Sequence, residues 1–159
     1  MTRTAAGTRK RRSPRGLLSG LFGFALLAAL SSVCSQAQSP TTPTFRTLEF
    51  FVDLGSVEAE LAAYQFEFVE SAQSAVVVGI EAGRDFPETP YYDPKALRGS
   101  RVIVAAYTLA AESTRGKCHV ATLHLMETSA DPKYQVDLIV AANAEGTPTT
   151  ATISWTEGQ

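Results

Sequence analysis

The chain has 159 residues and a formal net charge of −2, and this length is typical of one domain or of one domain with a short appendage. The charge is unevenly distributed, because residues 1–37 hold six of the 14 Lys and Arg and none of the 16 Asp and Glu. Residues 38–159 therefore carry a formal charge of −8, which opposes binding to nucleic acid and to anionic membrane surfaces.

The first 37 residues have the pattern of a cleavable secretory signal peptide. A basic segment without acids is followed by an uncharged apolar run of 14 residues, Leu17–Leu30. A membrane-spanning helix needs about 20 residues, so this run fits a signal peptide better than a permanent span. Small residues at Ser35 and Ala37 predict cleavage after Ala37. We therefore expect a periplasmic or extracellular protein with no integral membrane span.

The two cysteines bear on anchoring and on the core. Cys34 follows the apolar run closely enough to carry a lipid, and lipid anchoring is the alternative to release, although residues 31–33 match such a site poorly. After cleavage Cys118 has no intramolecular partner, so a hydrophobic core must hold the fold. We expect Cys118 to be a small buried residue at the start of a strand, with pairing between molecules as the alternative.

The first predicted strands follow a short leader. Residues 38–44 are rich in Pro and Thr and predict a flexible leader, after which one domain occupies residues 45–159. Strands are expected at Phe45–Asp53 and at Leu61–Val69. A third strand is expected at Ala75–Ile80, where three consecutive valines predict burial on both faces.

The second of these strands has the clearest periodicity in the chain. Tyr64, Phe66 and Phe68 alternate with the polar residues Gln65 and Glu67. A period of two is typical of a half-buried strand, so the three aromatic side chains are expected to face the core.

The second half of the chain predicts four further strands after a long loop. Residues 84–100 contain three prolines, which cannot continue a ladder, and predict a surface loop with a helical turn near residues 94–97. The four strands are Arg101–Leu109, Lys117–Glu127, Tyr134–Ala142 and Thr149–Thr156. Strands at this spacing without amphipathic helices predict an all-β fold, an antiparallel jelly-roll or immunoglobulin-like β-sandwich of about seven to nine strands.

Four segments, taken in order, resemble the core strands of cohesin-like domains: Leu61–Phe68, Val76–Gly83, Arg101–Tyr107 and Gly116–Leu123. The resemblance extends over residues 45–142, and the loop at 84–100 has no counterpart in it. It implies a sandwich akin to carbohydrate-binding modules, and a role in binding another protein or a glycan. A cohesin binds its dockerin through one sheet face, so the resemblance implies a flat face rather than a pocket. It carries no individual contact residue to this chain.

The sequence has no pattern typical of an active site, a metal centre or a cofactor site. His119 and His124 are five residues apart on one predicted strand, so we expect them on opposite faces, unable to act together in hydrolysis or to hold one ion. Loop calcium at Asp85, Glu88 and Asp93 is the remaining metal alternative, less favoured than three solvated acids. We therefore expect no enzyme, no metal and no cofactor.

Three aromatic residues are the candidates for binding. Tyr91 and Tyr92 lie in the predicted loop, and Trp155 lies in the last strand beside threonine and serine. Aromatic rings at the rim of a sandwich stack on sugars or anchor protein interfaces, whereas a loop tyrosine often packs back onto the sheet. Tyr92 is the one expected to pack inward.

Together these features predict an exported, non-catalytic binding module. The favoured function is protein–protein interaction in the cohesin manner, with a dockerin-like partner. The alternative is a carbohydrate-binding module that recognises extracellular or envelope polysaccharides. Its expected signature is an exposed aromatic row formed by Tyr91, Tyr92 or Trp155.

Overall fold

The computed structural model describes residues 42–110 and 114–158, and strands make up most of this part. The predicted signal peptide, its cleavage site and the alternative anchor at Cys34 lie outside the described residues. The long strands are β1 (Thr44–Asp53), β3 (Ala63–Glu70), β4 (Ala75–Ala82), β5 (Arg101–Tyr107), β7 (Lys117–Glu127), β8 (Tyr134–Ala142) and β9 (Thr152–Glu157). Two short strands, β2 (Glu60–Leu61) and β6 (Thr114–Arg115), pair with each other, and a 3-10 helix, η1, covers Pro94–Ala96.

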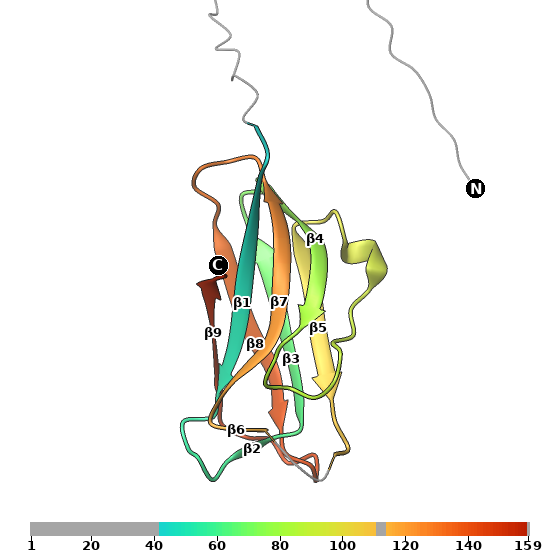
Figure 1. Cartoon of the computed structure of the whole chain (residues 1–159), viewed down its shortest axis with the longest axis vertical. Helices are drawn as coiled ribbons and strands as arrows, with labels where there is room; N and C mark the ends of the chain where they lie inside the picture. Colours follow the sequence, from blue (N-terminus) through green and yellow to red (C-terminus); the bar gives the residue numbers. More distant parts are fainter. Residues whose placement is uncertain (1–41, 111–113, 159) are drawn as a thin grey trace, which may run out of the picture. The chain divides into compact units, whose positions relative to one another are not determined.

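The long strands form two antiparallel sheets that face each other as a sandwich (Figure 1). One sheet has four strands in the order β4-β7-β1-β9, and the other has three in the order β5-β3-β8. Each long strand lies in the sheet opposite to that of the long strand before it, so each connection crosses the sandwich. The all-β antiparallel fold predicted from the sequence is confirmed, while its finer description as jelly-roll or immunoglobulin-like stays a prediction.

The core between the sheets is dominated by aromatic side chains. Tyr64, Phe66 and Phe68 of β3 are at most 1% exposed, which confirms the inward face predicted from their alternation. From β1, Phe50 stacks on Phe66 with ring centroids 5.0 Å apart and meets Phe68 edge to face. Cys118 is also fully buried, at the start of β7, as expected.

The expectation that the three valines of β4 are buried on both faces is wrong. Val77 is fully buried, whereas Val78 is 37% exposed and Val76 is partly exposed. The reason is the two-layer architecture: no third layer covers the four-stranded sheet within the described residues, so one face of β4 packs on the core and the other faces outward. The register against β7 also shifts between Val77 and Gly79, which leaves Val78 as an unpaired bulge residue.

A second bulge corrects the expected placement of the histidines. Phe51 of β1 pairs with His119 and Phe50 pairs with Ala121, so Val120 is an extra residue in β7. A bulge of one residue reverses the alternation beyond it. His119 and His124 therefore lie on the same outer face, not on opposite faces, where His119 faces Phe51 and His124 hydrogen-bonds Thr47.

The loop at 84–100 lies along one side of the sandwich and contains the predicted helical turn as η1. Phe86 anchors it, since this side chain is 4% exposed and meets Tyr64 edge to face at 5.0 Å. Asp93 caps η1 by accepting a hydrogen bond from the backbone N–H of Lys95. The prolines thus place the loop outside the sheets while one aromatic side chain ties it to the core.

Candidate functional site

The loop at residues 84–100 covers the outer edges of strands β4 and β5. Tyr91 pairs with Ala105 of β5 through both backbone hydrogen bonds, at 2.6 and 3.0 Å. The backbone of residues 98–99 pairs in the same way with Val77 of β4. Unpaired edges are templates for unwanted strand addition, so this cover protects one side of the sandwich. It also fixes the backbone of Tyr91 in line with the three-stranded sheet.

The side chain of Tyr91 stacks on Tyr107, the last residue of β5. The two rings are 6.2 Å apart and inclined by 15°, and they remain 64% and 57% exposed. Because Tyr91 pairs with Ala105, its side chain lies on the same outer face of the sheet as those of Ala105 and Tyr107. The pair forms an aromatic platform at the edge of that face.

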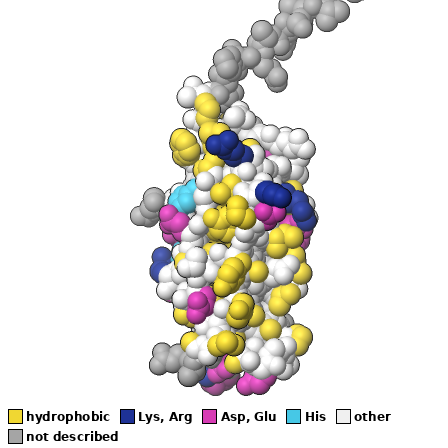
Figure 2. Space-filling view, turned by 90° about the vertical axis from the view of Figure 1, so that its right-hand side faces the viewer, with side chains coloured by type: hydrophobic (Ala, Val, Ile, Leu, Met, Phe, Trp, Pro, Cys, Tyr) yellow, Lys and Arg dark blue, Asp and Glu magenta, His cyan; other side chains and the backbone are white. Residues whose placement is uncertain are grey.

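Further exposed hydrophobic side chains lie on the same sheet. Ten large hydrophobic side chains are exposed within residues 42–110 and 114–158, and half of them belong to this surface. We call this surface the tyrosine face: Tyr91, Ile103, Tyr107, Ile139 and Val140. Its centre is more polar, with Gln65 and with Glu67 in an ion pair with Arg101. Figure 2 looks onto the adjoining side, formed by the loop and the edges of β4 and β5, where hydrophobic side chains also follow the length of the molecule.

The outer face of the four-stranded sheet differs in chemistry. Its central cross-strand row joins Glu81, Thr122, Glu49 and Thr156 from the four strands. In the next row His124 lies between Thr47, at 3.3 Å, and Glu81, at 3.2 Å. Charged and hydroxyl side chains thus cover the middle of this face, whereas the tyrosine face carries aromatic and aliphatic groups.

His119 has a structural role at the start of the loop. Its Nδ1 accepts a hydrogen bond from the backbone N–H of Arg84, so the ring proton belongs on Nε2, which donates to the carbonyl oxygen of Ala121 or to Thr122. Asp85 binds the backbone N–H of His119 in return. Nδ1 therefore holds the loop, while Nε2 is engaged within β7. No group of three or more His, Cys, Asp and Glu side chains in the described segments is arranged to hold a metal ion.

The aromatic candidates do not form one row. Tyr91 is at the β5 edge of the three-stranded sheet, whereas Trp155 of β9 contacts Tyr134 of β8, which is the opposite edge of that sheet. Tyr92 packs against the core and is only partly exposed. The structure thus separates Tyr91 and Trp155 into two sites and gives Tyr92 a packing role.

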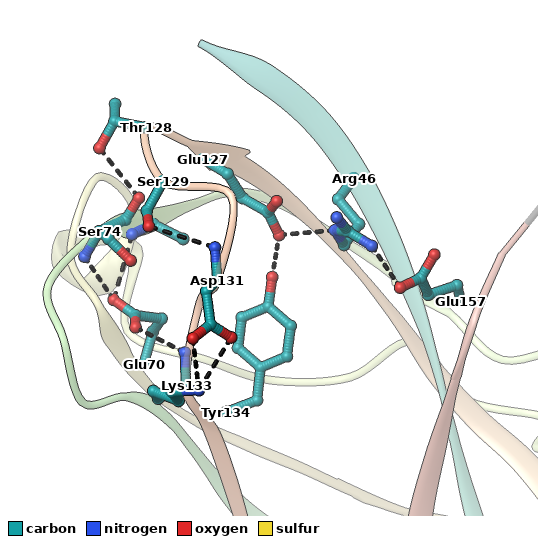
Figure 3. Close-up of polar contacts among 11 residues, drawn as sticks. Arg46, Glu70, Ser74, Glu127, Thr128, Ser129, Asp131, Lys133, Tyr134 and Glu157 are labelled. Atoms are coloured by element: carbon teal, nitrogen blue, oxygen red, sulfur yellow. Dashed lines mark hydrogen bonds and ion pairs between the residues drawn. The ribbon is translucent and has the colours of Figure 1, made fainter. Parts of the chain in front are cut away.

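Trp155 lines an open pocket of about 430 Å³ between β8 and β9. We call it the Trp155 pocket; its lining includes Arg46, Pro132, Lys133, Tyr134, Trp155 and Glu157. In its lining, Arg46 contacts both Glu127 and Glu157, and the phenol of Tyr134 donates to Glu127, as Figure 3 shows. The contact with Glu127, joined by the charges of both carboxylates, raises the pKa of Arg46 despite the opposing effect of burial.

Sequence reasoning identified Tyr91 and Trp155 but missed their partners. Tyr107 and Ile103 belong to a strand that is apolar on both faces. A strand with one face in water normally alternates apolar and polar residues, so this lack of alternation was the available signal of an apolar outer face. The pairing of Tyr91 with Ala105 leaves no trace in the sequence. The contact between the rings of Trp155 and Tyr134 leaves no trace in the sequence either.

The chain matches no protein-family model, no curated protein and no solved structure. The resemblance to cohesin-like domains accordingly stays a prediction. Within the described segments, no helix has the length and hydrophobicity needed to cross a membrane.

Proposed function

We propose that the protein is an exported, non-catalytic module that binds another protein through the tyrosine face. The observation that carries this proposal is the difference between the two outer faces. Of the ten large hydrophobic side chains exposed in the described segments, five lie on the outer face of the three-stranded sheet, while charged and hydroxyl groups cover the middle of the other sheet. Exposed apolar side chains concentrated on one face of a domain are typical of an interaction site.

The composition of the face favours a protein over a glycan as its ligand. Tyr91 and Tyr107 provide large contact area with few rotatable bonds, which is typical of interface anchors. Ile103, Ile139 and Val140 extend the surface with aliphatic groups that pack well against apolar side chains and form no hydrogen bonds with sugar hydroxyls. A protein surface with apolar groups on both sides of a polar middle satisfies the aromatic part and the aliphatic part of the face.

Charge restricts the class of partner further. Residues 38–159 have an excess of eight acidic groups, and on the face itself Arg101 is already paired with Glu67. A partner that combines basic residues with apolar contact groups is attracted at long range and is not repelled on contact. The resemblance to cohesin-like domains supports the same kind of flat recognition surface, and a dockerin-like protein is one partner of this class.

The proposal is tested with two matched variants. In the first, Tyr91→Ala and Tyr107→Ala are combined; the pairing of Tyr91 with Ala105 uses backbone atoms, so the loop keeps its place. In the second, Phe45→Ala removes a 73% exposed aromatic ring from the other outer face. Secreted and envelope proteins retained by the wild-type protein are identified, purified and titrated against all three proteins by calorimetry.

We expect the double tyrosine variant to bind its partner at least about tenfold more weakly, and the Phe45 variant to bind like wild type. Equal affinity of the tyrosine variant and wild type for every retained protein would exclude the tyrosine face as the site. A glycan, rather than a protein, lost from the double variant would reassign the face to carbohydrate recognition.

A further inference from the structure

Trp155 occupies an unusual position for the largest side chain of the domain. It pairs with Phe50, so the register directs it toward the space between the sheets. Phe50 is fully buried there, whereas Trp155 remains 38% exposed. The reason is that β9 is an edge strand, and its side chain lies at the opening between β9 and β8 rather than in the core. One part of the indole is fixed by Tyr134, and another faces the pocket.

The charged groups around this pocket are already paired with one another. Arg46 contacts Glu127 at 2.8 Å and also contacts Glu157, and Lys133 contacts Asp131 at 2.7 Å. A charged ligand would have to displace one of these internal partners, whereas an uncharged polyhydroxyl ligand would not. The planar guanidinium donates hydrogen bonds, and the carboxylate of Glu157 accepts them.

We propose that the Trp155 pocket binds one uncharged sugar ring of an oligosaccharide. The C–H face of a pyranose ring packs on the indole, and its hydroxyl groups meet Arg46, Lys133 and Glu157 at the rim. The pocket volume of about 430 Å³ is enough for one such ring, and the open side lets the rest of the glycan extend into solvent. This site is at the opposite edge of the three-stranded sheet from Tyr91, so it is independent of the tyrosine face.

The chain contains a single tryptophan, which makes the binding step directly observable. The purified protein is titrated at millimolar concentrations with cellobiose, maltose, mannobiose, xylobiose, lactose and N,N′-diacetylchitobiose, and the fluorescence of Trp155 is recorded. We expect at least one of these sugars to shift the emission to shorter wavelength and to protect the indole from quenching by acrylamide. We expect glucuronic acid and glucosamine to produce a smaller effect than the neutral sugars.

Two variants identify the site by calorimetry with the best sugar. Glu157→Gln retains the shape of an exposed side chain but removes its charge, and Trp155→Phe retains an apolar ring of smaller area. Both substitutions are expected to weaken sugar binding, and Trp155→Phe is expected to lower the affinity roughly tenfold. The double variant of Tyr91 and Tyr107 serves as the control and should bind the sugar like wild type, whatever becomes of the protein partner.

Three outcomes would overturn the assignment. The first is that the emission of Trp155 in the folded protein responds to none of the sugars. The second is that both pocket variants bind the sugar like wild type, and the third is that the protein prefers the charged sugars. The second outcome would place the sugar elsewhere, and the third would mean that an internal ion pair opens for the ligand.

Discussion

The phenol of Tyr64 donates a hydrogen bond of 2.8 Å to the carbonyl oxygen of Val120, the bulge residue of β7. The bond links the two sheets, because Tyr64 lies on β3 and Val120 on the four-stranded sheet. The same carbonyl accepts the backbone N–H of Gly83, where the loop begins. One interaction in the core thus supports both the bulge that reorients His119 and the loop that carries Tyr91.

Tyr64→Phe is expected to lower the free energy of unfolding by about 1 kcal/mol, because a buried hydrogen bond is lost while the carbonyl keeps its second donor. Urea denaturation measures the change. Tyr107→Phe, in which an exposed phenol is lost, is the matched control and should unfold like wild type. Equal stability of all three proteins would mean that the Tyr64 hydroxyl adds nothing net to the fold.

Gly83→Ala is expected to destabilise the protein by about 1–3 kcal/mol, the range typical of overpacking. A Cβ atom at this position would lie 2.0 Å from the carbonyl oxygen of His119, so the backbone must move. Gly79→Ala, in the preceding strand β4, is the control, since its Cβ would meet His124 at an ordinary 3.4 Å. Denaturation curves compare the two variants, and an undisturbed Gly83→Ala protein would contradict the close contact described here.

The fold follows from the sequence to the extent that it depends on local periodicity. Alternation in Leu61–Val69 identified the buried face of β3, and the prolines of residues 84–100 identified the loop. The bulges at Val78 and Val120 do not follow from periodicity. A bulge exists only relative to a partner strand, and a shift of one residue there exchanges the two faces for all residues beyond it.

The candidate sites were predictable only in part for a similar reason. Tyr91 and Trp155 can be selected from the sequence because aromatic residues in a loop or beside polar residues are candidates for ligand contacts. Their assignment to separate sites depends on which strands form the edges of each sheet, and this is set by long-range pairing. The charged groups of the Trp155 pocket come from β1, β9 and the segment before β8, so no local pattern joins them.

Cys118 is expected to be inert in the native protein. Burial, with the negative charges of Asp85 and Asp53 adding to it, raises the pKa of this thiol to about 11. The reactive thiolate is therefore scarce at pH 8. In a protein carrying Cys34→Ser, which leaves Cys118 as the single thiol, Ellman's reagent should react slowly in buffer and rapidly in concentrated urea.

The same shift fixes the alkaline pH dependence of stability. The folded thiol has a raised pKa, so its contribution is complete below the ordinary value of 9.0 and is lost as the pH rises toward 11. Cys118→Ala should therefore lose less stability between pH 8 and pH 10.5 than the protein with the thiol. Rapid labelling of the native thiol at pH 8 would show instead that β7 opens readily at this end.

Glu70 is a buried carboxylate that organises the turn between β3 and β4. It is 1% exposed and accepts four backbone N–H groups, from Ala72, Ser74, Ala75 and Lys133. Part of this arrangement is visible in Figure 3. Glu70→Gln places an amide NH₂ among these donors, and we expect a loss of about 2 kcal/mol or more in unfolding free energy. Glu145→Gln, at an exposed position, should change stability little.

The acid dependence of stability tests the same carboxylate. Burial alone would raise the pKa of Glu70, but the four N–H donors together lower it below the ordinary value of 4.5. Its contribution is therefore complete above pH 4.5 and is lost as the pH falls through the lower, folded pKa. The difference in unfolding free energy between wild type and Glu70→Gln should thus be constant from pH 7 to pH 5 and should shrink below pH 4. If this difference grew on acidification, the protonated form of Glu70, rather than the carboxylate, would be the form that the backbone of the turn stabilises.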